Sequence, residues 1–164
     1  MANAPLGAFV YDTNLPYAQM RPAVAHSTSA SQAGNVLVAN SFVKLSSNLL
    51  AANAAGDTTT YGFTLDASHI STDEPYTAPN GVTNSPVDVL NTKFVVNASS
   101  VSATSMSTPT LGSVYGLGVT AAGVPFIDLP NTTATFFRVE ARYPDDAATD
   151  INCRYICTVT ATRQ

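Results

Sequence analysis

Short apolar runs, separated by Gly, Pro and Asn, recur along the chain from residue 34 onward. The runs are rich in Val, Thr, Phe and Tyr, and this spacing is typical of strands joined by turns. We therefore predict an all-β fold, an antiparallel β-barrel or β-sandwich. The predicted strands cover residues 36–45, 60–65, 92–98, 112–119, 125–129, 134–143 and 152–161, and one or two helical turns are predicted over 46–55.

The clearest alternation of apolar and polar residues lies in the last two predicted strands. The turn-forming segment 144–150 joins them as an antiparallel hairpin. Over 136–143 the odd positions are predicted to face the core, and the outward residues are Phe136, Arg138, Glu140 and Arg142. The predicted inward residues of the partner strand are Cys153, Tyr155, Cys157 and Val159. The outer face is either a solvated sheet face or a docking surface.

The first 33 residues are predicted to form an extended N-terminal arm, and residues 34–164 a single β-sandwich or barrel domain. Three prolines, Pro5, Pro16 and Pro22, make a central strand unfavourable between them, because proline removes a ladder donor. The arm is nevertheless too apolar to be a solvated tail. It either folds back on its own domain or lies across a neighbouring subunit as an added strand.

Composition narrows the class of protein. A chain of 164 residues is the size of one domain with one core. The net charge of −4 argues against nucleic-acid binding, which needs clustered Lys and Arg. No apolar stretch is long enough for a membrane span, and the start lacks the pattern of a secretory signal, so we expect a protein released into the cytoplasm in which it is made.

The chain carries few groups that do chemistry. The segment Asp66-Ala67-Ser68-His69 places an acid, a hydroxyl and an imidazole together, but the members of a catalytic triad are normally supplied by separate elements. There is no nucleophile elbow and no phosphate-binding glycine loop. We therefore expect no enzymatic activity and no cofactor.

Metal binding has only weak candidates. His69 could act with Asp66, Asp73 and Glu74, and a second acidic group comprises Asp145, Asp146 and Asp150, but neither spacing matches a known metal motif, so no metal site is predicted. On one strand Cys153 and Cys157 would lie about 13 Å apart, beyond the reach of a disulfide. We expect both to be small buried packing residues.

One stretch of the chain resembles a known family. Gly34 opens a strand that ends Phe42-Val43-Lys44-Leu45, a small-residue connection contains Gly56-Asp57, and a second strand reads Tyr61-Gly62-Phe63-Thr64-Leu65-Asp66-Ala67. With the proline-punctuated arm, this layout resembles the small decoration, or cement, proteins of tailed-bacteriophage capsids. The segment after Ser68 is longer than in the smallest of those proteins.

The resemblance implies a non-enzymatic virion structural protein. Such a protein is a β-barrel or sandwich, often a homotrimer, that binds the outer surface of the capsid and stabilises contacts between major capsid protein subunits. The residues expected to contact the capsid are Phe9, Tyr11, Leu15 and Tyr17 of the arm, and Asp73, Glu74 and Tyr76 of the loop 66–85.

Two alternatives stay open. Another virion component, such as a head or tail fibre or tail protein, shares this composition. An extracellular carbohydrate-binding β-sandwich would carry coplanar exposed aromatic rings on one face, and against it the chain has no Trp.

Overall fold

The computed structural model describes residues 7–13, 20–22, 24–25, 40–65, 83–84, 86–99, 108–121, 123–147 and 153–164. Within them the chain forms strands and no helix. The strands are β1 (Ala8–Thr13), β2 (Val24–Ala25), β3 (Ser41–Ser46), β4 (Leu49–Ala52), β5 (Thr59–Thr60), β6 (Gly62–Thr64), β7 (Thr83–Asn84), β8 (Thr92–Ser99), β9 (Val114–Val119), β10 (Pro125–Asp128), β11 (Thr135–Arg142), β12 (Arg154–Val159) and β13 (Thr162–Arg163).

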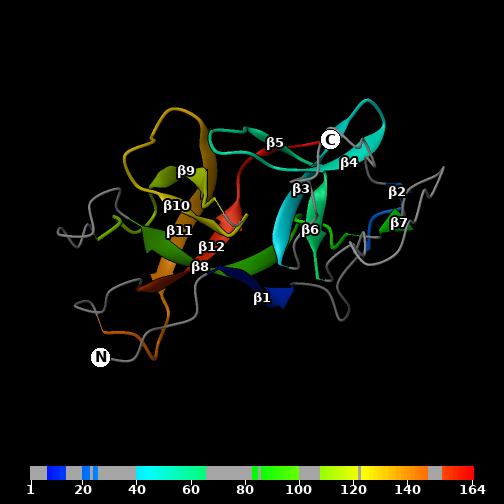
Figure 1. Cartoon of the computed structure of the whole chain (residues 1–164). Coiled ribbons are helices and arrows are strands. Elements are labelled where there is room, and N and C mark those ends of the chain that lie inside the picture. Colours follow the sequence, from blue (N-terminus) through cyan, green and yellow to red (C-terminus); the bar gives the residue numbers. More distant parts are fainter. Residues whose placement is uncertain are drawn as a thin grey trace.

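Five strands close into a barrel (Figure 1). The order is β8-β10-β9-β11-β12, and β12 pairs back onto β8. Four of the five pairings are antiparallel, and the fifth, between β8 and β10, is parallel. The predicted all-β barrel is confirmed, with one parallel contact that the alternation of residues does not reveal.

A smaller sheet, β4-β3-β6, stands beside the barrel. Its strands β3 and β4 form a hairpin where one or two helical turns were predicted over 46–55, so that prediction is wrong. The reason is local: Ser47 and Asn48 both have positive φ, 51° and 62°. Two consecutive residues of this kind make the two-residue turn whose twist suits a β-hairpin.

Two bulges in β11 break the predicted alternation. The register shifts between Thr135 and Phe137 in the pairing with β9, and between Val139 and Ala141 in the pairing with β12. Phe136, predicted to face outward, is fully buried, as is Phe137. A bulge allows two consecutive side chains to enter the core, because the extra residue is not opposed by a partner.

Phenylalanine rings join the barrel to the smaller sheet. Phe42 of β3 packs against four other rings, with centroids 4.8 to 5.4 Å away and tilted towards edge-to-face geometry. Those four are Phe63, Phe94, Phe136 and Phe137. Edge-to-face pairs add to the free energy of plain burial, so this cluster fixes how the two sheets sit together.

The Tyr-Gly-Phe strand is built for a close approach of backbone. A Cβ on Gly62 would lie 2.6 Å from Cβ of Pro86 and 2.8 Å from the carbonyl oxygen of Val87. The segment 86–88 therefore runs directly against β6, where Phe63 and Val87 exchange backbone hydrogen bonds of 2.7 and 2.9 Å. Gly62 is needed for this contact, because any side chain would displace the neighbour.

The cysteines are packing residues, as predicted. Cys153 and Cys157 are both free and buried. Burial raises the pKa of the Cys157 thiol, which keeps it protonated and unreactive at neutral pH.

Replacing Phe42 with Ala should lower the free energy of unfolding by about 3 to 5 kcal/mol, because the change removes the central ring of the cluster and leaves a cavity. Urea denaturation followed by far-ultraviolet circular dichroism measures this. The matched control is Leu111→Ala, at an apolar residue that is 58% exposed, which should change stability by less than about 0.5 kcal/mol. Equal losses for the two variants would show that the ring cluster is not the core.

Candidate partner-binding site

Strand β1 carries Phe9 and Tyr11, the two described arm residues that were predicted to contact a partner. It pairs antiparallel with β8, from Ala8 opposite Val96 to Thr13 opposite Thr92, and a bulge at Tyr11 interrupts the register. β1 ends the six-stranded order, and among the described residues its other edge has no partner strand. This agrees with the expectation that the proline-punctuated stretch forms no central strand. The free edge exposes backbone donors and acceptors that a further strand can use.

The described part of the arm lies on its own domain. Ala8 is fully buried in the barrel core, and Val10 packs against the same core. β2 pairs with β7. The division of the chain at residue 33, and the alternative in which other arm residues reach a neighbouring subunit, stay predictions.

An apolar strip runs across the outside of the barrel. Val95 and Ile156 are only 6% and 9% exposed, yet neither belongs to the two core clusters. In the register Val95 lies opposite Phe9 on one side and Ile156 on the other. Residues directly opposite in a sheet share a face. The strip Phe9–Val95–Ile156 therefore lies on the outer face of the barrel wall and not in the core.

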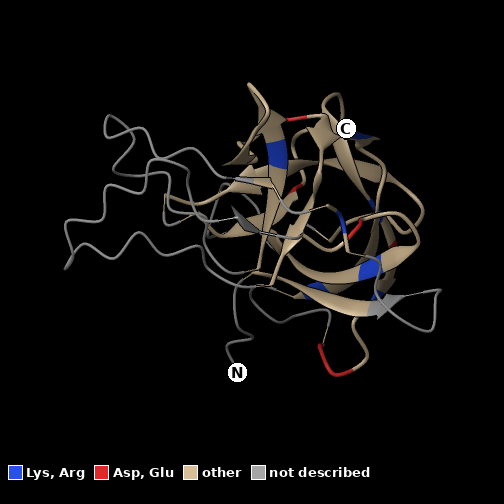
Figure 2. Cartoon of the chain, turned by 90° about the vertical axis from the view of Figure 1, so that its right-hand side faces the viewer, with Lys and Arg blue, Asp and Glu red and all other residues tan. Residues whose placement is uncertain are grey.

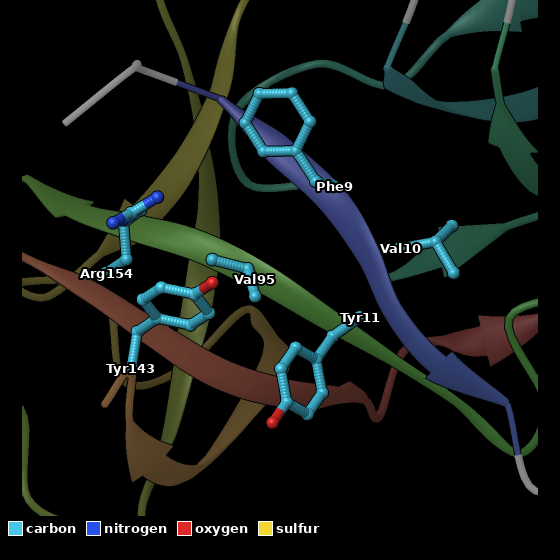
Figure 3. Close-up of a pocket in the computed structure, with 6 residues that line it drawn as sticks. All are labelled: Phe9, Val10, Tyr11, Val95, Tyr143 and Arg154. Carbon is cyan, nitrogen blue, oxygen red and sulfur yellow. The ribbon is translucent and has the colours of Figure 1, made fainter. Parts of the chain in front are cut away.

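Aromatic side chains form the walls over this strip (Figure 3). Phe9 and Tyr11 project from β1, and Tyr143 and Arg154 lie across β8 from them, with Val95 between. Together with Val10 they line a hollow of about 330 Å³. The Tyr11 and Tyr143 rings meet edge to face, with centroids 6.2 Å apart and planes at 84°. Tyr11 is nonetheless 46% exposed. We call Phe9, Tyr11, Val95, Tyr143, Arg154 and Ile156 the arm patch.

Arg154 is held rigidly in the arm patch. Its guanidinium lies over the Tyr143 ring, 4.3 Å from the centroid. Asp146 holds it from behind, accepting bonds from Nη2 at 2.7 Å, from Nε at 3.0 and 3.2 Å, and from the Arg154 backbone N–H at 2.7 Å. These hydrogen bonds outweigh burial and hold the pKa of Asp146 below its usual value. The same bonds raise the pKa of Arg154.

The structure brings together only part of the predicted contact set. Phe9 and Tyr11 meet in one patch. The other predicted contact residues, Leu15, Tyr17, Asp73, Glu74 and Tyr76, lie outside the described residues. Sequence reasoning missed Val95, Tyr143 and Arg154 as members of the site. Tyr143 was predicted to face the core, and only the pairing of β12 with β8 places Arg154 and the strand carrying Phe9 on either side of Val95.

A second cluster, also missed, ties distant parts of the chain together. Asp88 is 3% exposed and forms ion pairs with Arg21 at 3.7 Å and Arg163 at 3.1 Å. Arg21 also stacks on the Tyr61 ring, 4.2 Å from its centroid, and donates to the Gln164 carbonyl. We call this group the terminal clamp, because it fixes residue 21 of the arm and strand β13 to the segment 86–90.

The described residues offer little for catalysis or metal chemistry. No group of three or more His, Cys, Asp or Glu side chains among them is placed to hold a metal ion. Asp146, one of the acidic candidates, is occupied by Arg154, and His69, Asp66 and Asp150 are outside the described residues. In the part of the chain that the structure covers, no helix could cross a membrane.

Charged residues are sparse on the fold. Figure 2 shows short blue and red segments separated by long uncharged stretches. Several of the charges are already paired, as in Lys44 with Asp57 at 2.7 Å and Lys93 with Glu140 at 3.0 Å. Burial opposes ionisation of Asp57, but hydrogen bonds from Lys44, Ala54 and Asn53 together hold its pKa below the usual value.

Comparison with known proteins finds no family model, no curated protein and no solved structure that matches this chain.

Asp146→Asn should make the protein less stable at neutral pH and less sensitive to acid. The lowered pKa of Asp146 means that its contribution is present above the ordinary carboxyl pKa and is lost as the pH falls through the folded-state value. We expect a loss of about 1 to 3 kcal/mol at pH 7 that shrinks below about pH 4. Urea titrations between pH 2.5 and 7 measure it. Asp145→Asn, at the exposed neighbour, is the control, and a variant as acid-sensitive as the unaltered chain would contradict the assignment.

Asp88→Asn should loosen both ends of the terminal clamp at once. Removing the carboxylate leaves Arg21 and Arg163 without their shared partner, so amide exchange should speed up at residues 20–21 and 162–164 together. Hydrogen exchange read by mass spectrometry measures this, with the barrel strands as internal reference. Faster exchange at only one of the two segments would show that the clamp is not a single unit.

Proposed function

We propose that this protein is a non-enzymatic structural component of a phage virion. In this proposal it is a capsid decoration protein that binds the outer surface of the shell as a homotrimer and stabilises contacts between major capsid protein subunits. The observation that carries the proposal is the arm patch. Among the described residues it joins the unpaired edge of β1 to an exposed aromatic surface. Its members Phe9 and Tyr11 belong to the arm, which is part of the layout that resembles cement proteins.

Two physical features support a role in adhesion. A strand edge binds another chain through backbone hydrogen bonds and accepts varied sequences. Tyr11, Tyr143 and Arg154 are the residue types that contribute most to binding at protein interfaces, and here they surround an apolar centre at Val95. The patch is small, so firm attachment relies on several copies gripping a repeated lattice at once.

Surface chemistry fits the same proposal. The charged fraction is 11%, and polarity comes mainly from hydroxyl and amide groups. A hydroxyl or an amide can exchange water for a neighbour's hydrogen bond, whereas an unpaired charge is costly to desolvate. Such a surface suits a protein that stays attached to a large assembly.

The geometry of the arm patch bears on the carbohydrate alternative. Sugar rings stack on exposed aromatic faces, and a binding platform needs those faces to be coplanar. Tyr11 and Tyr143 stand at 84° to each other, and Arg154 already covers one face of Tyr143. This arrangement favours a protein ligand over a saccharide. The fibre or tail alternative differs from decoration only in its location in the virion.

Binding to expanded capsids that lack the protein tests the proposal. The unaltered chain should co-sediment saturably, and the shells should then survive heat better. Deleting the whole arm, so that the chain starts at residue 34, would not isolate the effect on binding, because it also removes Ala8 from the core. Tyr11→Ser alters an exposed residue, and we expect it to weaken binding by about tenfold or more, since per-site losses multiply in a trimer.

Leu111→Ser is the matched control, at another exposed apolar residue, and it should bind like the unaltered chain. Thermal melts verify that both variants are folded. Absence of binding by the unaltered chain, with the protein found only in tails or fibres of dissected particles, would refute decoration in favour of another virion role.

A further inference from the structure

We propose that the arm patch binds an extended acidic peptide segment, in which an apolar side chain is followed by an Asp or Glu. The apolar side chain enters the hollow over Val95, and the carboxylate accepts hydrogen bonds from Arg154. This deepens the proposed function, on which its biological meaning rests, by naming the chemistry of the partner segment.

The first step of the argument is the unused hydrogen-bonding capacity of Arg154. A guanidinium has five N–H donors in a fixed fork. Asp146 takes those of Nε and one of Nη2, and within the described residues Nη1 donates to no other group. Because Arg154 also lines the hollow, the remaining donors are available to a ligand there.

The second step is the imbalance between donors and acceptors in the hollow. The described residues that line it are Phe9, Val10, Tyr11, Val95, Tyr143 and Arg154, and Arg154 is the charged one among them. None of these described side chains is a carboxylate, and Asp146, which pairs with the guanidinium, is not among them. The tyrosine hydroxyls add two more donors. Asp146 balances much of the Arg154 charge, so the match to a carboxylate comes from the N–H and O–H donors that the lining side chains still offer and not from a net positive charge.

The third step is preorganisation. Arg154 is fixed by its hydrogen bonds to Asp146 and by the Tyr143 ring, over which its guanidinium lies. Little side-chain entropy therefore remains to be lost on binding. The apolar strip below is already assembled by strand pairing. A volume of about 330 Å³ accommodates an apolar side chain and the adjoining backbone. The shape suits an extended segment, because the hollow runs alongside β1.

Short peptides test this chemistry without any capsid. The first probe is acetyl-Ser-Leu-Asp-Ser-amide. The second replaces its Asp with Asn, and the third replaces its Leu with Ser. Each peptide is added to the full chain labelled for NMR. Saturable shifts should appear at the Val95 methyls and the Arg154 Nε–H. The Leu-Asp peptide should bind about threefold to tenfold more tightly than the Leu-Asn peptide, because a hydrogen bond to a charged group is stronger. Removal of the leucine should abolish saturation.

Two variants separate binding from folding. Tyr143→Leu keeps an apolar contact but removes the ring under the guanidinium, and should reduce the preference for Asp over Asn. Leu111→Ser should leave both affinities unchanged.

Equal affinity for the Leu-Asp and Leu-Asn peptides, or shifts confined to residues outside the arm patch, would overturn the inference. So would saturable shifts with a neutral oligosaccharide and none with the peptides. Peptide binding without capsid binding would refute decoration and leave this inference standing. Capsid binding without peptide binding would overturn this inference and leave the decoration proposal standing.

Discussion

Strand β8 is hydrogen-bonded along both edges, and this constraint holds the barrel, the arm and the candidate site together. One edge pairs with β12, and the other pairs first with β1 and then, beyond it, with β10. The inward side chains Phe94 and Val96 belong to the buried core, while Val95 faces the opposite way. On that outer face β1 places Phe9 directly beside Val95.

The arm therefore has two physical roles that are difficult to separate. Ala8 and Val10 belong to the core, whereas Phe9 and Tyr11 belong to the arm patch. Alternation along a strand makes this possible, because consecutive residues serve opposite faces. Strand pairing with β8 fixes the position of Phe9 and Tyr11 relative to the barrel. The terminal clamp adds a second attachment at Arg21, far along the arm from β1.

Much of the barrel could be predicted from alternation, and the exceptions have local causes. The predicted strands over 92–98, 125–129 and 134–143 match β8, β10 and β11 closely. The helix predicted over 46–55 is wrong because a hairpin forms there, with positive φ values at Ser47 and Asn48. Neither residue type requires a positive φ, so the sequence does not mark the turn.

A bulge explains why Phe136 was predicted to face outward. The bulge shifts the register by one residue, and composition alone does not mark bulges. Half of the arm patch depends on pairing between β1, β8 and β12, which are far apart in sequence. Pairing partners of that kind leave no periodic signal.

The contacts around Arg154 show how a protein with few charges can hold one cationic group in a fixed orientation. A buried ion pair contributes little net stability, because desolvation offsets much of the attraction. Asp146 and Arg154 avoid part of that cost, since Arg154 stays partly exposed and the carboxylate also accepts the Arg154 backbone N–H. The main effect of the pair is to fix the orientation of the Arg154 guanidinium. Tyr143 and Asp146 together set the plane of the guanidinium, and Figure 3 shows Arg154 beside the hollow, with Val95 next to it. One orienting charge beside an apolar hollow discriminates between ligands more sharply than a broad charged surface, because a ligand must satisfy both contacts at a fixed separation.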